Sequence, residues 1–399
     1  MNIKPHGDPL RSRLIALNVL SLLLYSPNFI SVVYPALKGL QLAIVLVTAG
    51  YLLATVGLRI DRLTASFLLF LGFLVSSAAV NYLRFDNAES LYLALSYIVK
   101  ALSVVMLFQL CRTPRDLDRM LKLCAIGLVI CALHGIFQFI AVALGLVAVQ
   151  GSVELLGYEF VDVGWAGIYR VAFPIGDFNL VRIQSFFQEP GFFAFYLLFG
   201  LVLLDCVRAR MPFRHATLCA GIIKVAMLLT LSLTGIVLML VYLVIKTRSW
   251  LFRGAAVAVA LIAIDFIVFN ESEFIAKTGS LDMRLENFAL FETLVSSWEN
   301  IVFGIGFGNE TMISEFRVNN FIAELLMYSS MFGLLVMLVL LGLAMKRGHK
   351  TNHIVLMVLL YSLSTPMLWS PLFLLAVFMS WRVPRAVVAR FRPRVLAVA

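Results

Sequence analysis

The sequence predicts an all-α, polytopic integral membrane protein, and composition and charge pattern carry that prediction. Of its 399 residues, 62% are hydrophobic and only 14% are charged, whereas soluble domains are about 45–50% apolar. The formal net charge is +10, but the basic residues lie in short runs between apolar stretches, as in loops retained on the cytoplasmic side of a membrane. We therefore attribute the charge to topology and exclude a nucleic-acid partner.

Twelve membrane-spanning helices are expected in a single transmembrane domain, 1–399. A helix needs ~20 apolar residues to cross a bilayer. The N-terminal run from Leu14 lacks a small-residue cleavage site, so we count it as a retained span. Ten stretches are suitable, and two of them, 216–246 and 354–381, are each expected to cross twice. The ten are 14–33, 36–57, 64–83, 90–110, 121–148, 189–207, 216–246, 254–269, 319–345 and 354–381.

Basic flanks indicate that the two longest stretches turn back on themselves. Arginines in 208–214 precede the stretch 216–246, and lysine and arginine in 246–253 follow it. Because both flanks belong on the cytoplasmic side, the chain must cross twice, with its turn near Ser232 to Gly235. The last stretch also has basic flanks and a proline-containing middle, so it too is expected to cross twice.

The same rule places both termini in the cytoplasm and two long loops, 149–188 and 270–318, outside. Most of the acidic residues lie in these two loops. All five cysteines fall in apolar segments or beside basic loops, so we expect no disulfide framework. Any chemistry should therefore face outward.

The second long loop has its own helical pattern. Apolar residues recur there at Leu281, Leu285, Phe288, Phe291, Leu294, Val295 and Trp298. This spacing predicts an amphipathic helix on the outer membrane surface, with Arg284 near its start. Gly304, Gly306 and Gly308 then alternate with bulky apolar residues. We interpret this run as a re-entrant turn packed against other helices rather than as a phosphate-binding loop.

An arginine and a glutamate come together where the first long loop enters a membrane helix, in the stretch Arg-Ile-Gln-Ser-Phe-Phe-Gln-Glu-Pro-Gly-Phe-Phe-Ala of residues 182–194. Glu189 suits the positive N-terminal end of a helix, and Pro190 suits its first position. The long Arg182 side chain can extend its charged end to the lipid headgroups. Taken alone, the physics favours this structural interpretation. The alternative is a catalytic or phosphate-binding edge at the membrane surface.

Three segments together resemble the integral-membrane O-antigen polymerase and ligase superfamily of bacterial envelope glycan assembly. Residues 182–194 are similar to the signature that ends the family's first periplasmic loop. The run 231–235 resembles a Ser-Arg-Gly-type turn, with a leucine at the arginine position. The segment from Arg284 to Asn309 resembles the passage through the second loop. The signature matches are Arg182, Ser185, Phe187, Glu189 and Pro190.

The resemblance implies a fold of the lipid-linked-sugar glycosyltransferase (GT-C) type. It implies polymerisation of undecaprenyl-diphosphate-linked repeat units into O-antigen or exopolysaccharide, on the periplasmic side of the bacterial inner membrane. The family's ligases carry a histidine where this chain has Asn319 and Asn320, so a ligase is disfavoured. It remains an alternative, as does a transporter or flippase, which the intramembrane Lys100 and His134 would suit.

The implied reaction transfers a glycan from its diphosphate lipid to a hydroxyl of the next unit. Arginine forks match phosphate oxygens, and we choose Arg182 and Arg284 for that role, with Arg170 and Arg317 in reserve. Glu189 is placed to act as the general base. The outer loops contain no metal-ligand cluster, so we expect metal-independent chemistry without a cofactor.

The partners implied by the resemblance are the lipid-linked glycan donor and acceptor and the membrane lipids, with a chain-length regulator and a flippase of the same pathway. We interpret Lys100 and His134 as buried hydrogen-bonding partners. These two residues, Asp265 and Glu324 are left out of the catalytic set.

Overall fold

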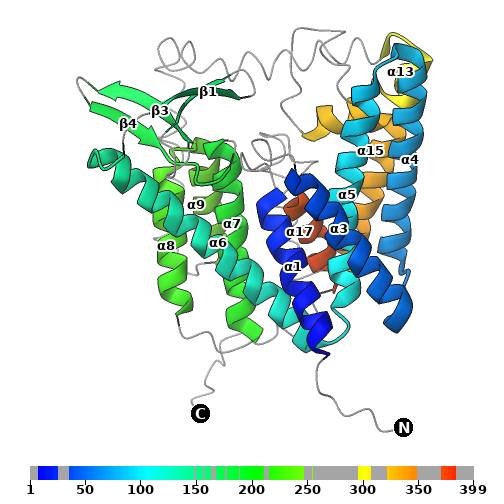
Figure 1. Cartoon of the computed structure of the whole chain (residues 1–399), viewed down its shortest axis with the longest axis horizontal. Helices are drawn as coiled ribbons and strands as arrows, with labels where there is room; N and C mark the ends of the chain where they lie inside the picture. Colours follow the sequence, from blue (N-terminus) through cyan, green and yellow to red (C-terminus); the bar gives the residue numbers. More distant parts are fainter. Residues whose placement is uncertain are drawn as a thin grey trace.

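The computed structural model is a helical bundle that carries one small sheet (Figure 1). It describes residues 8–25, 36–147, 150–155, 158–162, 168–175, 178–187, 189–210, 215–246, 254, 295–306, 321–347 and 370–382. Its elements are α1 (Pro9–Tyr25), α3 (Ala36–Tyr51), the π-helix η1 (Leu52–Val56), α4 (Arg62–Phe85), α5 (Ala88–Leu110), α6 (Pro114–Ala143), β1 (Gly151–Leu155), β2 (Tyr158–Asp162), β3 (Ile168–Ile175), β4 (Phe178–Arg182), α7 (Pro190–Arg210), α8 (Ala216–Leu229), α9 (Leu233–Lys246), α13 (Trp298–Phe303), α15 (Phe321–Arg347) and α17 (Pro371–Arg382).

The helical membrane class predicted from the sequence is confirmed. Among the described residues, six helices are long and apolar enough to cross a membrane by length and composition, and each coincides with an expected span. The expected span 254–269, most of the interfacial helix 281–298 and the first half of 354–381 lie outside the described residues.

The stretch 216–246 is divided into two helices, as its basic flanks predicted. The helix α8 ends at Leu229 and α9 begins at Leu233, close to the expected turn. Leu231 adopts a left-handed backbone conformation with φ of 49°, which α-helical residues do not adopt. The chain therefore changes direction at this residue, and it does so without a glycine.

The first long loop folds as an antiparallel sheet with strand order β1-β2-β3-β4, which we did not predict. Its strands carry closely spaced apolar, β-branched and aromatic residues, such as Tyr-Glu-Phe-Val-Asp in β2 and Ile-Tyr-Arg-Val-Ala-Phe-Pro-Ile in β3. Such segments favour short strands, which a search for ~20-residue apolar runs does not detect. Figure 1 shows the sheet at one end of the bundle, beside α6, α7 and α8.

The helix α6 connects the two ends of the bundle. It begins with a capping box between Thr113 and Asp116, and Asp116 forms a 3.5 Å salt bridge to Arg11 at the start of α1. Its 30 residues span about 45 Å at 1.5 Å per residue. The other end of α6 contacts β4, so the same helix anchors both the basic end and the sheet end of the protein.

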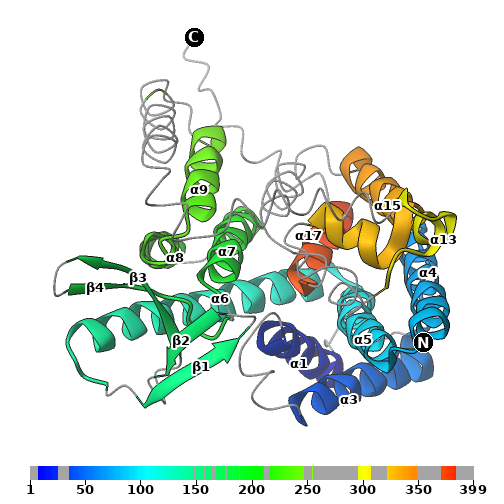
Figure 2. The ribbon, with the colours of Figure 1, turned by 90° about the horizontal axis from the view of Figure 1, so that it is seen from above.

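The helix α7 is the central helix of the described bundle. Within its span Pro190–Arg208, 83% of the residues are buried inside the protein, compared with 28–50% in the other five candidate spans. It packs against α6, α8 and α9, as Figure 2 shows from above. The junction between β4 and α7 therefore leads directly from the sheet into the protein core.

Candidate active site at the junction of β4 and α7

The end of β4 bonds to the turn between α8 and α9. The Ile183 N–H donates to the Leu229 carbonyl at 3.3 Å, and Arg182 Nε donates to the Thr230 carbonyl at 3.2 Å. These bonds bring together the segments 182–194 and 231–235, which the sequence suggested as separate motifs.

Two of the arginines chosen from the sequence are paired in the sheet. Arg170 of β3 and Arg182 of β4 are direct partners in the antiparallel register. Directly opposite residues in such a pair have Cβ atoms about 4.5–5.5 Å apart, and like charges at these positions destabilise a sheet. A bound anion offsets that repulsion, and guanidinium groups match phosphate oxygens in geometry. The register therefore brings the two arginine positions to one place in the sheet.

The chain after β4 makes a tight, strained turn that α6 supports. Ser185 has a φ of 53°, a conformation that costs a residue with a side chain about 1–3 kcal/mol. Gln138 Oε1 accepts hydrogen bonds from the backbone N–H groups of Gln184 and Ser185, each at 3.2 Å. Gln138 Nε2 in turn donates to the Ile168 carbonyl at 2.8 Å. One side chain of α6 thus joins this turn to the start of β3.

A second α6 side chain contacts the same turn. His134 Nδ1 lies 3.1 Å from Ser185 Oγ, and its ring stacks on Phe186 with centroids 3.9 Å apart and planes inclined by 20°. The interpretation of His134 as a hydrogen-bonding partner within the membrane region is confirmed. Its partner belongs to the 182–194 segment, however, so His134 is part of the candidate site from which we had excluded it.

The side chain of Gln184 is buried without hydrogen bonds to other described residues. It has no exposed surface, and neither atom of its amide has a hydrogen-bond partner in the part of the chain that the structure describes. A buried polar group without a partner costs about 1–3 kcal/mol. The amide offers a donor and an acceptor side by side, which is the complement of a hydroxyl group.

The start of α7 has the geometry expected of Glu189 and Pro190. The helix begins at Pro190, and the Glu189 carbonyl accepts the Phe193 N–H at 3.1 Å. The Glu189 side chain is half-buried. Phe187 stacks on Phe193 with centroids 5.2 Å apart and contacts Tyr196 at 4.5 Å. These aromatic contacts fix the helix start against the preceding turn, so the carboxylate comes from a rigid junction.

Glycines allow the neighbouring helices to approach this junction closely. A Cβ on Gly235 of α9 would lie 2.6 Å from the Ala194 Cβ of α7. A Cβ on Gly135 of α6 would lie 2.8 Å from the Phe193 ring and 3.1 Å from Ile183. Real Cβ contacts are not this short, so both positions require glycine in this packing.

A second polar cluster lies where the second long loop meets α4. Arg84 Nη2 donates to Asn300 Oδ1 at 2.8 Å, and Arg84 Nη1 donates to Asn81 Oδ1 at 3.2 Å. Asn81 Nδ2 donates to the Phe303 carbonyl at 3.1 Å, and Ser77 Oγ donates to the same carbonyl. The segment around α13 is therefore fixed to the C-terminal end of α4.

The same segment fills a break in α15. Ser330 interrupts that helix with a φ of 67°, and Ser330 Oγ accepts the Phe332 N–H at 3.2 Å, so it caps the second half. The break frees the Met327 carbonyl, which accepts hydrogen bonds from the Ile305 and Gly306 N–H groups at 2.7 and 3.1 Å. The predicted packing of the glycine-rich run against other helices is confirmed for Gly304 and Gly306.

The remaining candidates are distributed as follows. Arg284 and Arg317 lie outside the described residues, as do Asp265 and Gly308. Glu324 is buried and lies within electrostatic range of Tyr97 on α5. Figures 1 and 2 agree that α4, α13 and α15 lie across the bundle from β4 and α8. The Arg84 cluster is therefore separate from the Arg182 site.

Comparison with protein-family models, curated proteins and solved structures finds no match for this chain.

Proposed function

We propose that this chain is a membrane glycosyltransferase whose donor is a glycan carried on a lipid diphosphate. The register pairing of Arg170 with Arg182 supports this proposal most directly. It makes the two arginines register partners in the strand pair that leads to Glu189 and α7. A diphosphate leaving group carries concentrated negative charge, and fixed guanidinium groups stabilise such charge as it develops.

More particularly, we propose a polymerase of undecaprenyl-diphosphate-linked repeat units, working without a metal ion. Glu189 takes the proton from the acceptor hydroxyl, whose oxygen then forms a bond to the anomeric carbon of the donor. The bond between that carbon and the diphosphate oxygen breaks, and the lipid diphosphate leaves with the electron pair. Arg170 and Arg182 hold the leaving group, and Arg284 and Arg317 are proposed to complete its binding site.

The turn around Ser185 is proposed to bind the acceptor glycan. Its backbone is held by Gln138, and its neighbour Gln184 presents a buried amide without a partner among the described residues. An amide of this kind would bind a sugar hydroxyl through one donated and one accepted hydrogen bond. This group would position the acceptor close to Glu189.

The proposal places the reaction on the periplasmic side of the bacterial inner membrane, with twelve crossings and both termini in the cytoplasm. The sheet and the turn between α8 and α9 lie at one end of the bundle, since Ile183 and Arg182 bond to Leu229 and Thr230. This agrees with the expectation that residues 149–188 and 232–235 share the outer face. The expected partners are the lipid-linked donor and acceptor, with a flippase and a chain-length regulator of the same pathway.

The test is the length distribution of lipid-linked glycan in cells that lack this protein. A polymerase predicts single repeat units on the outer face, and purified protein should extend such units into chains without added metal. Long lipid-linked chains that fail to reach their final acceptor would instead indicate a ligase. Repeat units retained on the inner face would indicate a flippase. Either of these outcomes would reject the polymerase.

A further inference from the structure

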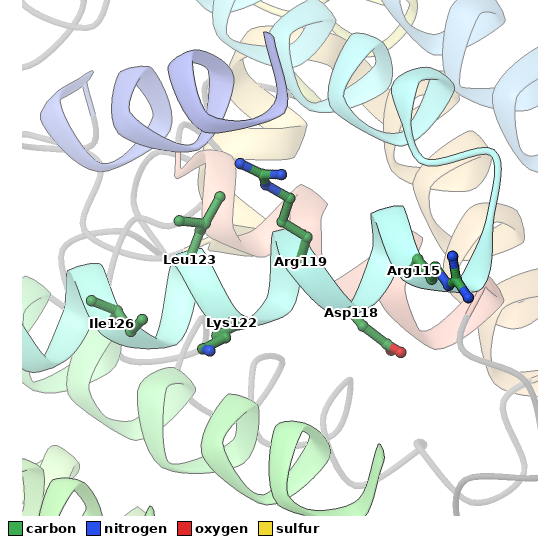
Figure 3. A pocket seen from close by; sticks show the side chains of 6 residues that line it. All are labelled: Arg115, Asp118, Arg119, Lys122, Leu123 and Ile126. Atoms are coloured by element: carbon green, nitrogen blue, oxygen red, sulfur yellow. The ribbon is translucent and has the colours of Figure 1, made fainter. Parts of the chain in front are cut away.

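A groove lined by the first turns of α6 lies at the end of the bundle away from the sheet. Its lining residues are Arg115, Asp118, Arg119, Lys122, Leu123 and Ile126, and its volume is about 510 Å³. Figure 3 shows that all six side chains come from this one helix, with Arg115 near the helix start and Ile126 farthest along it. This volume falls within the range of about 300–1,000 Å³ that is typical of ligand pockets.

Helical spacing explains why these residues share a face. Arg115, Arg119 and Leu123 are separated by four residues each, and Asp118, Lys122 and Ile126 form a neighbouring row with the same spacing. The opposite side of α6 packs into the core through the buried residues Leu117, Met120, Leu121 and Cys124. Most of the groove therefore lies on the side of the helix away from the core, and the half-buried Leu123 also packs against the edge of the core.

The groove changes from charged to apolar along the helix. Arg115, Arg119 and Lys122 are exposed, whereas Leu123 and Ile126 are half-buried. The three cations span about 10 Å along the axis, and Ile126 lies about 16 Å beyond Arg115, at 1.5 Å per residue. The helix itself is one of the candidate membrane spans. In a helix that enters the membrane from this end, the cations would lie at the membrane–water interface and the apolar residues would lie deeper.

We propose that this groove binds an anionic phospholipid of the surrounding leaflet, with the phosphate headgroup on Arg115, Arg119 and Lys122 and an acyl chain along Leu123 and Ile126. Three cations and one carboxylate give the groove a net charge of +2, so the charge complements an anionic headgroup. Basic pockets at the ends of membrane helices bind such headgroups through the same attraction. A soluble anion would leave the apolar half of the groove unoccupied.

This site is independent of the proposed glycosyl transfer. It lies at the opposite end of α6 from His134 and Gln138, which contact the candidate active site. Lipid binding can therefore be measured on purified protein without any glycan substrate, and its failure would leave the proposed polymerase unaffected.

The experiment uses the purified full chain and native mass spectrometry to count bound phosphatidylglycerol, with phosphatidylcholine as the zwitterionic control. Replacing Arg115, Arg119 or Lys122 with Gln should weaken phosphatidylglycerol binding about fivefold for each charge removed. The reverse change, Asp118→Asn, raises the net charge and should tighten binding by a similar factor. Arg62→Gln removes an exposed cation at the start of α4, outside the groove, and should leave binding unchanged.

Each alternative occupant predicts a different result. Equal retention of phosphatidylcholine and phosphatidylglycerol by the wild type would overturn the proposal, because no headgroup would be selected. Competition by soluble glycerol phosphate at the affinity of the lipid would indicate a free-phosphate site and would also overturn it. If one of the Gln variants fails to accumulate, Asp118→Asn and the other single substitutions still decide, since tighter and weaker binding are both predicted.

Discussion

Arg170 and Arg182 are direct partners across strands β3 and β4, although eleven residues separate them along the chain. An unliganded sheet gains nothing from two like charges at one register position. The start of α7 places Glu189 seven residues after Arg182, so one residue proposed to bind the donor and the proposed general base lie close together in the chain.

Replacing either arginine with lysine should reduce chain growth about 10- to 100-fold, because lysine keeps the charge but lacks the two-pronged geometry. The substitutions are Arg170→Lys and Arg182→Lys, and the sequence predicts the same loss for Arg284→Lys. Each variant should insert and accumulate normally, as should the control Arg62→Lys, which should retain activity. Wild-type polymerisation by all three variants would return these arginines to a structural role.

Glu189→Gln separates catalysis from helix stabilisation. Loss of a general base should lower turnover about 10²–10⁴-fold, with donor binding retained through the arginines. If Glu189 only favours the start of α7, the substitution should cost a fraction of the ~0.3–1 kcal/mol typical of a charge at a helix terminus. The assay is glycan extension by purified protein. Chain growth at the normal rate would exclude Glu189 and move attention to Asp177, which lies outside the described residues.

Gln184→Met tests the buried amide. Methionine is similar in length and removes two polar atoms that have no partner among the described residues, so the free energy of unfolding should rise by about 1–3 kcal/mol. Extension of the acceptor should nevertheless fall, since the sugar hydroxyl loses both of its hydrogen bonds. Thermal unfolding and turnover are measured on the same preparation. A more stable protein with unchanged turnover would show that the amide does not bind substrate.

Gly304→Ala should loosen the attachment of the second loop. The glycine has a φ of 69°, and a Cβ there would lie 2.5 Å from the Met327 carbonyl oxygen. A cost of about 1–3 kcal/mol follows from the backbone strain alone, and protease should cut the second loop more readily. Gly50→Ala in α3 is the matched control, because a Cβ there meets nothing within 4 Å and alanine favours helix.

The Asp8 carboxylate should make the attachment of α1 to α3 sensitive to acid. The Tyr51 hydroxyl donates a hydrogen bond to Asp8, and this bond is the largest cause that holds the pKa of Asp8 below its usual 3.8. The backbone N–H groups of Leu10 and Arg11 and the Arg11 charge lower the pKa further, and together these effects outweigh desolvation, which raises it. Because the pKa of Asp8 is lower in the folded than in the unfolded protein, the ionised carboxylate stabilises the fold at a pH above its unfolded pKa. This stabilisation is lost as the pH falls through the folded-state pKa. Wild type should therefore unfold at a higher temperature than Asp8→Asn at pH 7, and the difference should shrink below pH 4. A difference independent of pH would refute this linkage.

Hydropathy and charge predicted the membrane helices well because both act over long windows. The division of 216–246 followed from its basic flanks alone, and α7 begins at the proline that its sequence indicated. The sheet in 149–188 was missed because its strands have only five to eight residues, and a search for apolar runs of ~20 residues does not detect such short segments.

The candidate site was only partly predictable. Arg182 and Glu189 stand out in the sequence, since charge beside an apolar helix needs an explanation. Gln138 and His134 carry no such signal, because they lie within an ordinary apolar helix some fifty residues before the turn that they contact. Their role depends on how α6 packs, and packing over that separation is not encoded in any local pattern.

The break at Ser330 has a consequence for biogenesis. A backbone carbonyl that a helix break releases inside a bilayer is costly unless another group binds it, and here the Ile305 and Gly306 N–H groups bind the Met327 carbonyl. These partners precede α15 along the chain, so the ribosome has synthesised all of them before Ser330 emerges. The groups that bind the released carbonyl are therefore already part of the nascent chain when α15 is made.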